Sequence, residues 1–519
     1  MSVPADTDAR TLAEQHGLPY VDLNELGVSY EACDLLPGRI LERIEALPYA
    51  IEGDLLRVAI ADPANVQAID ELRLATRFNV VLAVASKADI LAEISRHARL
   101  AAGQDATGAE FYDSIASGAE DDLEAEDGMS DAPLVRLVNS IIFQAAEDGA
   151  SDVHFEPQED ALVVRVRIDG VLHEVQRVPR RLTAGVTTRL KVLASLDIAE
   201  RRKPQDGRIT LNAAAAGRLL DIRVATLPTV YGESVVMRLL DKSKKPPTVD
   251  ALGLSPEMRT HFEQIIYRPT GALLVTGPTG SGKSTTLYAA LAEIRQPEVN
   301  IITVEDPVEY RLAGVNQVQI NVRAGLTFAA ALRSILRSDP DIVMVGEIRD
   351  SETAKISIEA ALTGHFVLST LHTNDAPGTL TRLNEMGVEP FLTGSAVSAV
   401  LAQRLVRKLC TCSELYSPTV DELLGAHISP VVAAACEGMI LYRKRGCPRC
   451  GRTGFRGRIG IFQLLAMSET IQRLAAGKAS REEIERAAIE EGMRTLWDDG
   501  LAKVSAGLTS IEELARVCL

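Results

Sequence analysis

Short stretches of alternating apolar and polar residues mark the first part of the chain. The alternation over 56–60 ends at an Asp-Pro pair, a turn signal, and so predicts a half-buried strand. Helical periodicity follows over 68–78 and again over 87–98. We therefore predict a small α/β module over residues 1–99, in which no constellation of catalytic residues stands out.

A helical apolar stripe over 134–145 begins a second module. The alternation over 162–168 then ends at Asp169 and Gly170, a strong hairpin signal. We predict an α+β module over 133–241, followed by a hinge with a basic start. Further strands are predicted at 208–211, 219–225 and 234–240, and the hinge at 242–255.

From about residue 256 onward the pattern changes to helical segments that alternate with short apolar runs. Apolar runs spaced by helices are typical of a mostly parallel sheet that is covered on both faces. The fold class of the region 256–519 is therefore α/β. The predicted strands lie at 272–276, 301–304, 342–345 and 366–370.

Composition and charge predict a linker and the cellular compartment of the protein. The 519 residues carry 55 basic and 71 acidic side chains, and ten of the acids lie between Arg99 and Arg136, where there is no Lys or Arg. Like charges repel, so 100–132 is predicted to be a flexible acidic linker, or else an acidic docking tail. No apolar stretch is long enough to span a membrane and no signal peptide precedes the chain, so we expect a cytoplasmic protein.

One stretch matches the phosphate-binding pattern G-x-x-x-x-G-K-[ST]. It follows the apolar run 272–276 and opens a helical run over 285–294, which is the context this pattern requires. Backbone N–H groups of such a loop surround the β-phosphate, while the lysine reaches the β/γ oxygens and the serine binds Mg²⁺. We therefore predict that the chain binds ATP and Mg²⁺. The predicted binding residues are Gly277, Pro278, Thr279, Gly280, Ser281, Gly282, Lys283, Ser284 and Thr285.

Hydrolysis also needs carboxylates near the metal and the attacking water. Glu347 follows an apolar strand and a glycine, and is a candidate for holding Mg²⁺ together with Ser284. Glu305, at the end of the 301–304 strand, is the candidate for positioning water, and Asp306 and Glu309 are alternatives. A structural role as a helix cap or ion-pair partner is the alternative for any one of these acids.

Two histidines bracket the strand 366–370. His365 precedes it and His372 follows it. Each alone is more often a structural hydrogen-bonding residue, but in a phosphate-binding domain they are candidate sensors of the γ-phosphate.

Two close cysteine pairs lie late in the chain. Cys410 and Cys412 form a C-x-C pair, and Cys447 and Cys450 form a C-x-x-C pair. Four thiolates make a closed tetrahedral Zn²⁺ site of structural character. We predict such a site, with Cys436 as an alternative ligand because the first pair has the less usual spacing.

At this point the sequence resembles a known family. The segments 276–286, 303–310, 337–350 and 362–375 are similar to the Walker A, Asp, Walker B and His boxes of the bacterial type II secretion and type IV pilus assembly ATPases. The likeness covers roughly 133–519, including 151–154 and 199–209 upstream and the cysteine pairs downstream. Those relatives usually carry C-x-x-C in both cysteine pairs, so the first pair departs from the pattern.

The resemblance implies a RecA-like ATPase domain over 256–519, with a zinc subdomain at about 405–460 and helices over 466–519. A PAS-like second module would precede it and an N-terminal docking domain would open the chain. It further implies a homo-hexamer that lies at the cytoplasmic face of the inner membrane through platform proteins. Its ATP hydrolysis would drive pseudopilus or pilus assembly.

The family's arginine fingers map onto two positions of the second module, Arg208 and Arg223. Planar guanidinium groups suit the spread charge of a phosphoryl group in transfer. The hinge between them and Lys283 would let them reach the ATP site of their own chain or of a neighbour, and because ring assembly favours the neighbour, we predict that they complete the ATP site of a neighbouring subunit. Exposed strand arginines would be the structural alternative.

The type II secretion branch is the favoured function. The segments 284–288 and 196–202, and the short N-terminal module, resemble that branch more than pilus assembly, which is the alternative. Retraction motors generally lack the cysteine pairs. Some relatives bind cyclic dinucleotides, but the arginine-led repeat used for this is not found before Leu18, so no such ligand is predicted.

Rivals of another class are weaker. A docking or sensor protein that binds ATP without turnover would show damage to the acids or arginines, and none is seen. A nucleic-acid translocase would show a basic stripe with stacking aromatic residues, which is not found.

Overall fold

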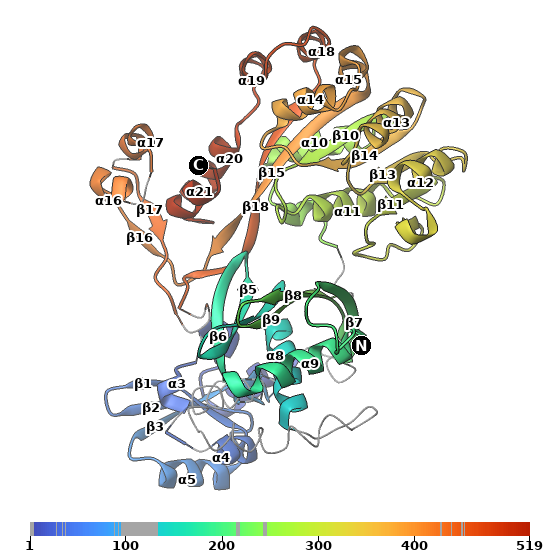
Figure 1. Ribbon diagram of the computed structural model, residues 1–519. Helices are drawn as coiled ribbons and strands as arrows, with labels where there is room; N and C mark the ends of the chain where they lie inside the picture. Colours follow the sequence, from blue (N-terminus) through green and yellow to red (C-terminus); the bar gives the residue numbers. More distant parts are fainter. Residues whose placement is uncertain are drawn as a thin grey trace.

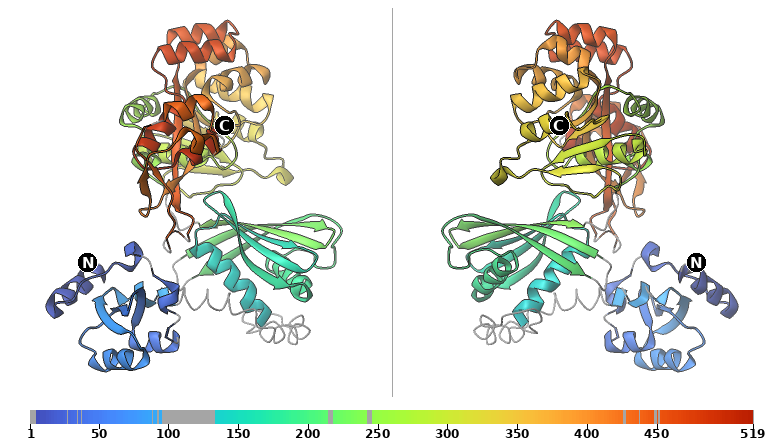
Figure 2. Two further views of the ribbon diagram at one scale, coloured as in Figure 1. Left: turned by 90° about the vertical axis from the view of Figure 1, so that its left-hand side faces the viewer. Right: turned by 90° about the vertical axis from the view of Figure 1, so that its right-hand side faces the viewer.

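The computed structural model describes residues 5–518 except 27, 34, 37, 88, 92, 95–132, 214–217, 242–245, 426–427, 437, 448–449 and 451. The predicted linker at 100–132 and the basic start of the hinge therefore lie outside the described residues. Figures 1 and 2 show three separate bodies, with the C-terminal α/β unit above the other two. No helix in the described part of the chain is both long enough and apolar enough to cross a membrane.

The N-terminal unit contains a small three-stranded sheet in the order β1-β2-β3, with β1 antiparallel and β3 parallel to β2. The predicted strand at 56–60 is β2. The predicted helix at 68–78 ends at Ala75, because the chain turns at Thr76, whose hydroxyl accepts a hydrogen bond from the N–H of Phe78. The elements are α1 (Ala5–His16), α2 (Leu23–Leu26), α3 (Tyr30–Cys33), α4 (Gly38–Ile44), β1 (Ala46–Glu52), β2 (Leu55–Ile60), α5 (Val66–Ala75) and β3 (Asn79–Val84).

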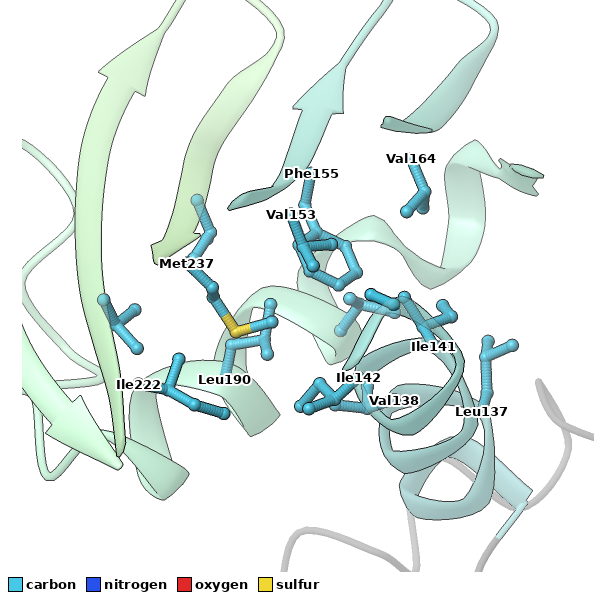
Figure 3. Close-up of a cluster of buried hydrophobic side chains, with 14 of the residues drawn as sticks. Leu137, Val138, Ile141, Ile142, Val153, Phe155, Val164, Leu190, Ile222 and Met237 are labelled. Carbon is cyan, nitrogen blue, oxygen red and sulfur yellow. The ribbon is translucent and has the colours of Figure 1, made fainter. Parts of the chain in front are cut away.

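The second unit is a six-stranded antiparallel sheet in the order β6-β5-β4-β9-β8-β7. Two helices, α8 and α9, cover one face, and the core between them and the sheet includes Val138, Phe155, Leu190 and Met237 (Figure 3). The elements are α8 (Pro133–Glu147), β4 (Asp152–Pro157), β5 (Ala161–Ile168), β6 (Val171–Pro179), the 3₁₀ turn Arg180–Leu182, α9 (Thr183–Leu193), β7 (Gln205–Ala213), β8 (Arg218–Thr229) and β9 (Gly232–Asp241).

The C-terminal unit is built on a seven-stranded sheet in the order β12-β11-β13-β14-β10-β15-β18, parallel except for the β15–β18 pair. Residues of β10 alternate between two cores: Leu273 and Val275 pack with α10 and α11, whereas Ala272 and Leu274 pack with α13 and α14. The predicted parallel sheet with two covered faces is confirmed.

The first half of this unit comprises the 3₁₀ turn Val249–Leu252, α10 (Pro256–Ile266), β10 (Gly271–Thr276), α11 (Lys283–Ile294), β11 (Ile301–Glu305), β12 (Asn316–Gln319), the 3₁₀ turn Val322–Ala324, α12 (Phe328–Ile335), β13 (Ile342–Val345), α13 (Ser351–Leu362) and β14 (Phe366–Leu371). The second half comprises α14 (Ala376–Glu385), α15 (Pro390–Ala396), β15 (Val397–Leu409), β16 (Glu414–Tyr416), α16 (Val420–Gly425), α17 (Pro430–Ala435), β17 (Leu441–Arg443), β18 (Phe455–Ala466), α18 (Glu469–Ala476), α19 (Arg481–Glu490), α20 (Leu496–Ser505) and α21 (Ile511–Cys518).

One turn of the second unit touches the C-terminal unit. Asp169, at the β5–β6 hairpin, accepts a hydrogen bond from the Gly457 N–H at 2.8 Å and forms an ion pair with Arg458 at 3.3 Å. Asp169 and Gly170 have positive φ, as the predicted hairpin turn requires. The turn that joins two strands of the second unit is thus also a contact with β18.

Candidate functional site

The phosphate-binding loop lies between β10 and α11, at the carboxyl edge of the parallel strands. Gly277 and Gly282 have φ of 147° and 87°. A Cβ at Gly277 would lie 2.4 Å from the carbonyl oxygen of Gln403, and one at Gly282 would lie 2.8 Å from the Gln403 side-chain nitrogen. Glycine is therefore required at both positions by conformation and by the close approach of β15.

Lys283 is buried inside the curve of this loop. Its ammonium donates hydrogen bonds to the carbonyl oxygens of Gly277 at 2.8 Å and Pro278 at 3.0 Å. Burial lowers the pKa of Lys283 to about 8, although the nearby Glu347 carboxylate raises it. A buried cation with mainly carbonyl partners fits an anionic phosphate as its missing counter-charge.

A second observation fits the same ligand. The hydroxyl of Ser281 is buried and makes no hydrogen bond to any described residue. Ser284 and Thr285 lie in the first turn of α11, partly buried, where backbone N–H groups have no partner inside the helix. The loop thus supplies a cation, hydroxyls and N–H donors to one spot, as a nucleotide phosphate and its Mg²⁺ require.

Glu347 and His372 come together beside the loop. Glu347 lies two residues after the end of β13 and His372 directly follows β14, and the His372 Nε2 lies 3.5 Å from a Glu347 carboxylate oxygen. Arg349 also forms an ion pair with Glu347. Glu347 also acts electrostatically on Lys283, which places Glu347 and its two partners on the same side of the sheet as the loop.

His365 lies elsewhere. It precedes β14, and its carbonyl accepts a hydrogen bond from the N–H of Gly271, the first residue of β10. β10 and β14 are parallel, in register from Gly271 to Thr276, so the loop is a whole strand away, about 20 Å at 3.3 Å per residue. The structure does not bring His365 to the site, and its prediction as a sensor does not fit.

Glu305 is buried at the end of β11, in a network of neutral donors. One carboxylate oxygen accepts from Thr303 at 2.6 Å and from Gln317 at 3.2 Å, and the other accepts from the Tyr288 hydroxyl. Burial raises the pKa of Glu305, and these hydrogen bonds oppose the rise. The oxygen that meets Tyr288 keeps acceptor capacity for a water molecule.

The predicted arginine fingers lie in a cross-strand row of the second unit. Arg208, Arg223 and Arg238 face each other in register on β7, β8 and β9. Arg208 forms an ion pair with the buried Asp221. Arg223 and Arg238 act electrostatically on Glu309. Burial raises the pKa of Glu309, and the charges of these two arginines oppose the rise. Arg223 thus approaches the C-terminal unit of its own chain.

The four cysteines of the two pairs converge. Their sulfurs all lie within 4.8 Å of one another, with Cys410 3.8 Å from Cys447 and Cys412 4.0 Å from Cys450. Thiolates on a tetrahedral zinc with Zn–S of about 2.3 Å lie about 3.8 Å apart, so the spacing fits. Cys436 is buried in the apolar cluster of Leu423 and Leu441 instead.

Three residues beside the loop were not predicted. Gln403 accepts a hydrogen bond from Thr286 at 2.7 Å, and its backbone and side chain lie close to Gly277 and Gly282 of the loop. Arg404 acts electrostatically on Lys283, and Tyr288 holds Glu305. Gln403 and Arg404 could have been found from the sequence, because they are two polar residues that directly follow the mostly apolar run 396–402.

Comparisons with known proteins identify the family of this chain. The sequence model of the family described as "Type II/IV secretion system protein" matches residues 127–516, and that of the MshEN domain matches 16–104. The chain is 46% identical over 518 residues to the type II secretion system protein E of Xanthomonas campestris, covering 98% of this chain and 90% of that protein. It is 44% identical over 516 residues to the type IV pilus assembly ATPase PilB of Myxococcus xanthus, covering 97% and 89%.

The fold is also shared with solved structures. The ATPase DotB of Yersinia pseudotuberculosis matches with a TM-score of 0.55 at 19% identity, over 76% of this chain and 96% of that chain. The DotB of Legionella pneumophila matches with a TM-score of 0.53 at 20% identity, over 73% and 94%. At these identities the likeness concerns the fold alone.

Proposed function

Because the chain belongs to the Type II/IV secretion system protein family, we propose that it is the hexameric ATPase that powers type II protein secretion by driving pseudopilus assembly at the inner membrane. The single observation that carries ATP hydrolysis is the meeting of Lys283, Glu347 and His372 around the glycine loop.

Each residue has a task that its surroundings suit. Lys283 neutralises charge on the β- and γ-phosphates, since its ammonium is buried in the loop. Glu305 positions and polarises the attacking water through its partly free oxygen. His372 lies on the γ-phosphate side through its contact with Glu347, where it donates to the phosphoryl group in transfer.

The metal expected here is Mg²⁺, held by the Ser284 hydroxyl and, through water, by Glu347. When bound, it would neutralise developing charge on the phosphates. Glu347 is 17% exposed in its side chain and so can accept from water while its other contacts hold it in place.

Arg223 is proposed to contribute to hydrolysis by neutralising negative charge on the γ-phosphate. The Arg223 side chain is exposed. It also acts electrostatically on Glu309, which lies in the segment 303–310 that resembles the Asp box. Arg208 is held by Asp221 and is proposed to reach a phosphate only after this ion pair opens. We keep the proposal that ring assembly places these arginines at the ATP site of a neighbouring subunit.

The cysteine cluster is proposed to hold one structural Zn²⁺. The zinc would join the segment between β15 and β16 to the segment between β17 and β18. It would thereby hold the β16–β17 lobe in its fold. The N-terminal unit is proposed to dock on a platform protein of the inner membrane, which would place the chain at the cytoplasmic face. No role for nucleic acid is proposed.

Type IV pilus assembly is the second candidate, because a PilB matches over as much of this chain as a secretion ATPase does. Deleting the gene in its own host separates the two. Secretion is the function if exported enzymes stay inside the cell and surface pili persist. Lost pili with normal export would instead assign pilus assembly, and complementation with Lys283→Ala should restore neither.

A further inference from the structure

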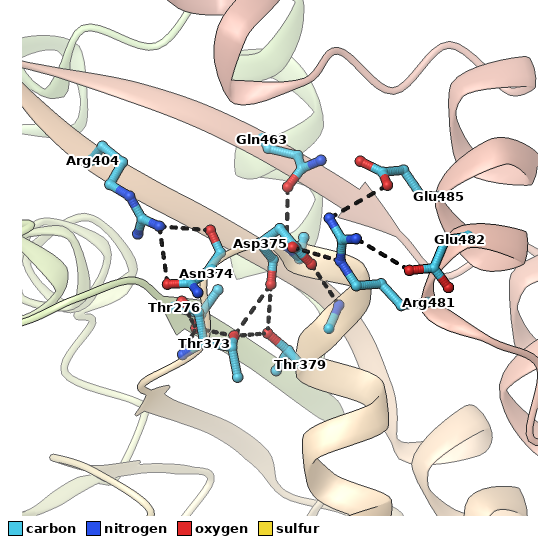
Figure 4. Close-up of polar contacts among 12 residues, drawn as sticks. Thr276, Thr373, Asn374, Asp375, Thr379, Arg404, Gln463, Arg481, Glu482 and Glu485 are labelled. Atoms are coloured by element: carbon cyan, nitrogen blue, oxygen red, sulfur yellow. Dashed lines mark hydrogen bonds and ion pairs between the residues drawn. The ribbon is translucent and has the colours of Figure 1, made fainter. Parts of the chain in front are cut away.

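A four-residue loop links the γ-phosphate side of the site to a helix far along the chain. His372, at the end of β14, begins the loop, and Asp375 ends it as the N-cap of α14. Figure 4 shows that side chains from β10, β15 and α19 reach this loop from different sides. The position of His372 therefore depends on what holds the other three residues.

Thr373 fixes the loop to the strand that carries the phosphate-binding loop. Its N–H donates to the hydroxyl of Thr276 at 3.0 Å, and the two hydroxyls also pair. Thr276 is fully buried and is the residue directly before Gly277. Movement of the loop 372–375 is thereby coupled to the end of β10.

Asp375 fixes the loop to α19. One carboxylate oxygen caps α14 by accepting from the Gly378 N–H at 2.7 Å, and the other accepts from the Arg481 Nε at 2.8 Å. The Asp375 side chain is only 16% exposed, against 42% for Arg481. Loss of Arg481 would leave a largely buried carboxylate without its closest cation, which is the costly direction of change.

The place of Arg481 in its own helix argues for a role outside it. Arg481 is the first residue of α19, where the helix dipole disfavours a cation. Its contacts to Glu482 and Glu485 on the same helix, at 3.4 and 3.5 Å, are longer than its contact to Asp375. The side chain is thus directed at the loop more than at its own helix.

A second arginine holds the loop from the opposite side. Arg404 donates to the carbonyl of Asn374 at 2.9 Å, and Asp375 lies within its electrostatic range. An Asp375 released by Arg481 would be attracted toward Arg404, and the loop would shift with it. Figure 4 shows the two guanidinium groups on either side of Asn374 and Asp375.

We propose that Arg481 is a positioning residue for ATP hydrolysis: its ion pair with Asp375 holds the loop 372–375, and with it His372, in register with the phosphate-binding loop. This inference rests on the proposed ATPase function.

The test is steady-state hydrolysis by the assembled full-length chain, with ATP-binding stoichiometry measured on the same samples. Arg481→Ala should lower kcat about tenfold, with KM within twofold and about one ATP bound per folded chain. Arg481→Lys, which keeps one donor to Asp375, should recover part of the rate. Arg486→Ala, an exposed arginine of the same helix, is the matched control and should behave as wild type.

A double-mutant cycle separates positioning from folding. Asp375→Asn keeps the cap oxygen of α14 but removes the charge that Arg481 meets. Arg481→Ala should therefore cost little more in the Asp375→Asn background than that variant alone. If Arg481→Ala folds poorly, Asp375→Asn alone still decides the matter, because it keeps the cap of α14 and should lower kcat about as much as the loss of Arg481.

Two results would overturn the inference. One is a kcat of Arg481→Ala equal to that of Arg486→Ala, and the other is additive losses in the cycle. A wild-type chain that binds ATP and never hydrolyses it would instead refute the proposed function itself.

Discussion

At the scale of single residues, burial strongly perturbs the ammonium of Lys283 in the ATP site. Burial lowers its pKa to about 8, so above that pH the free protein loses the charge that attracts phosphate. ATP affinity should therefore be about tenfold weaker at pH 9 than at pH 7, since binding requires the protonated form. Calorimetric titration at both pH values measures this, and equal affinities would show that the ammonium stays charged.

Glu305 separates binding from turnover. Glu305→Gln keeps the hydrogen-bond acceptor for Tyr288 or Thr303 but has no negative charge to polarise water. We expect ATP binding within a few-fold of wild type and a kcat lower by about 10²–10⁴. Because burial raises the pKa of Glu305, wild-type kcat should also fall with decreasing pH at a higher pH than an ordinary carboxylate would produce.

The controls for this variant are Glu309→Gln and Asp306→Asn, each measured for phosphate release and ATP binding. Both should keep most of the turnover. Near-normal hydrolysis in Glu305→Gln combined with its loss in one of the controls would transfer the water-positioning role to that neighbour.

Sequence patterns found those residues that a local motif specifies. The glycine loop and Lys283 follow from their spacing, because a phosphate needs those groups in one continuous turn. Gln403 and Tyr288 were missed, since their roles depend on which strand lies beside the loop and which helix covers it. His365 precedes its strand, and because ligands bind at the carboxyl ends of parallel strands, its position in the sequence already placed it at the opposite edge.

At the scale of elements, the short apolar runs of the C-terminal unit were predicted well, whereas its strands β15 and β18 were not predicted. The runs at 272–276 and 342–345 became β10 and β13. β15 extends over Val397–Leu409 and ends with exposed and partly buried basic residues, so no single periodicity covers it. β18 contains two glycines among its first six residues, which weakens any strand signal.

The cysteine cluster leads to a prediction for the β16–β17 lobe. Purified protein should contain about one zinc per chain, and Cys412→Ser should lose most of it. Cys436→Ala is the matched control, because Cys436 is a buried cysteine outside the cluster, and it should keep its zinc. Chelation should make 405–460 sensitive to protease and leave ATP binding unchanged.

Metal analysis by mass spectrometry, with limited proteolysis on the same samples, measures both effects. Purified wild type without zinc would contradict the site. Loss of zinc in Cys436→Ala but not in Cys412→Ser would show that the ligand set is different.

At the scale of the whole molecule, the question is which subunit receives Arg223. Within one chain Arg223 acts electrostatically on Glu309, and among the described residues Asp169 of the second unit contacts Gly457 and Arg458 of the C-terminal unit. Such a contact allows the second unit to shift in a ring, so that a neighbour's arginine completes the site.

Mixing two inactive variants tests this sharing. In rings formed from equal amounts of Arg223→Ala and Lys283→Ala chains, about a quarter of the interfaces should combine an intact Lys283 with a neighbour's intact Arg223. ATPase activity should recover to about that fraction after the subunits exchange. If Arg223 serves its own chain, every site in the mixture carries one defect and activity should not recover.

If this chain hydrolyses ATP at the loop 277–284, the purified full-length protein should release phosphate from ATP. We expect Mg²⁺-dependent phosphate release by wild type and about a hundredfold less for Lys283→Ala, which should also lose ATP binding. Equal release by the two proteins would contradict the claim, as would a wild type that binds ATP without releasing phosphate under assembly conditions.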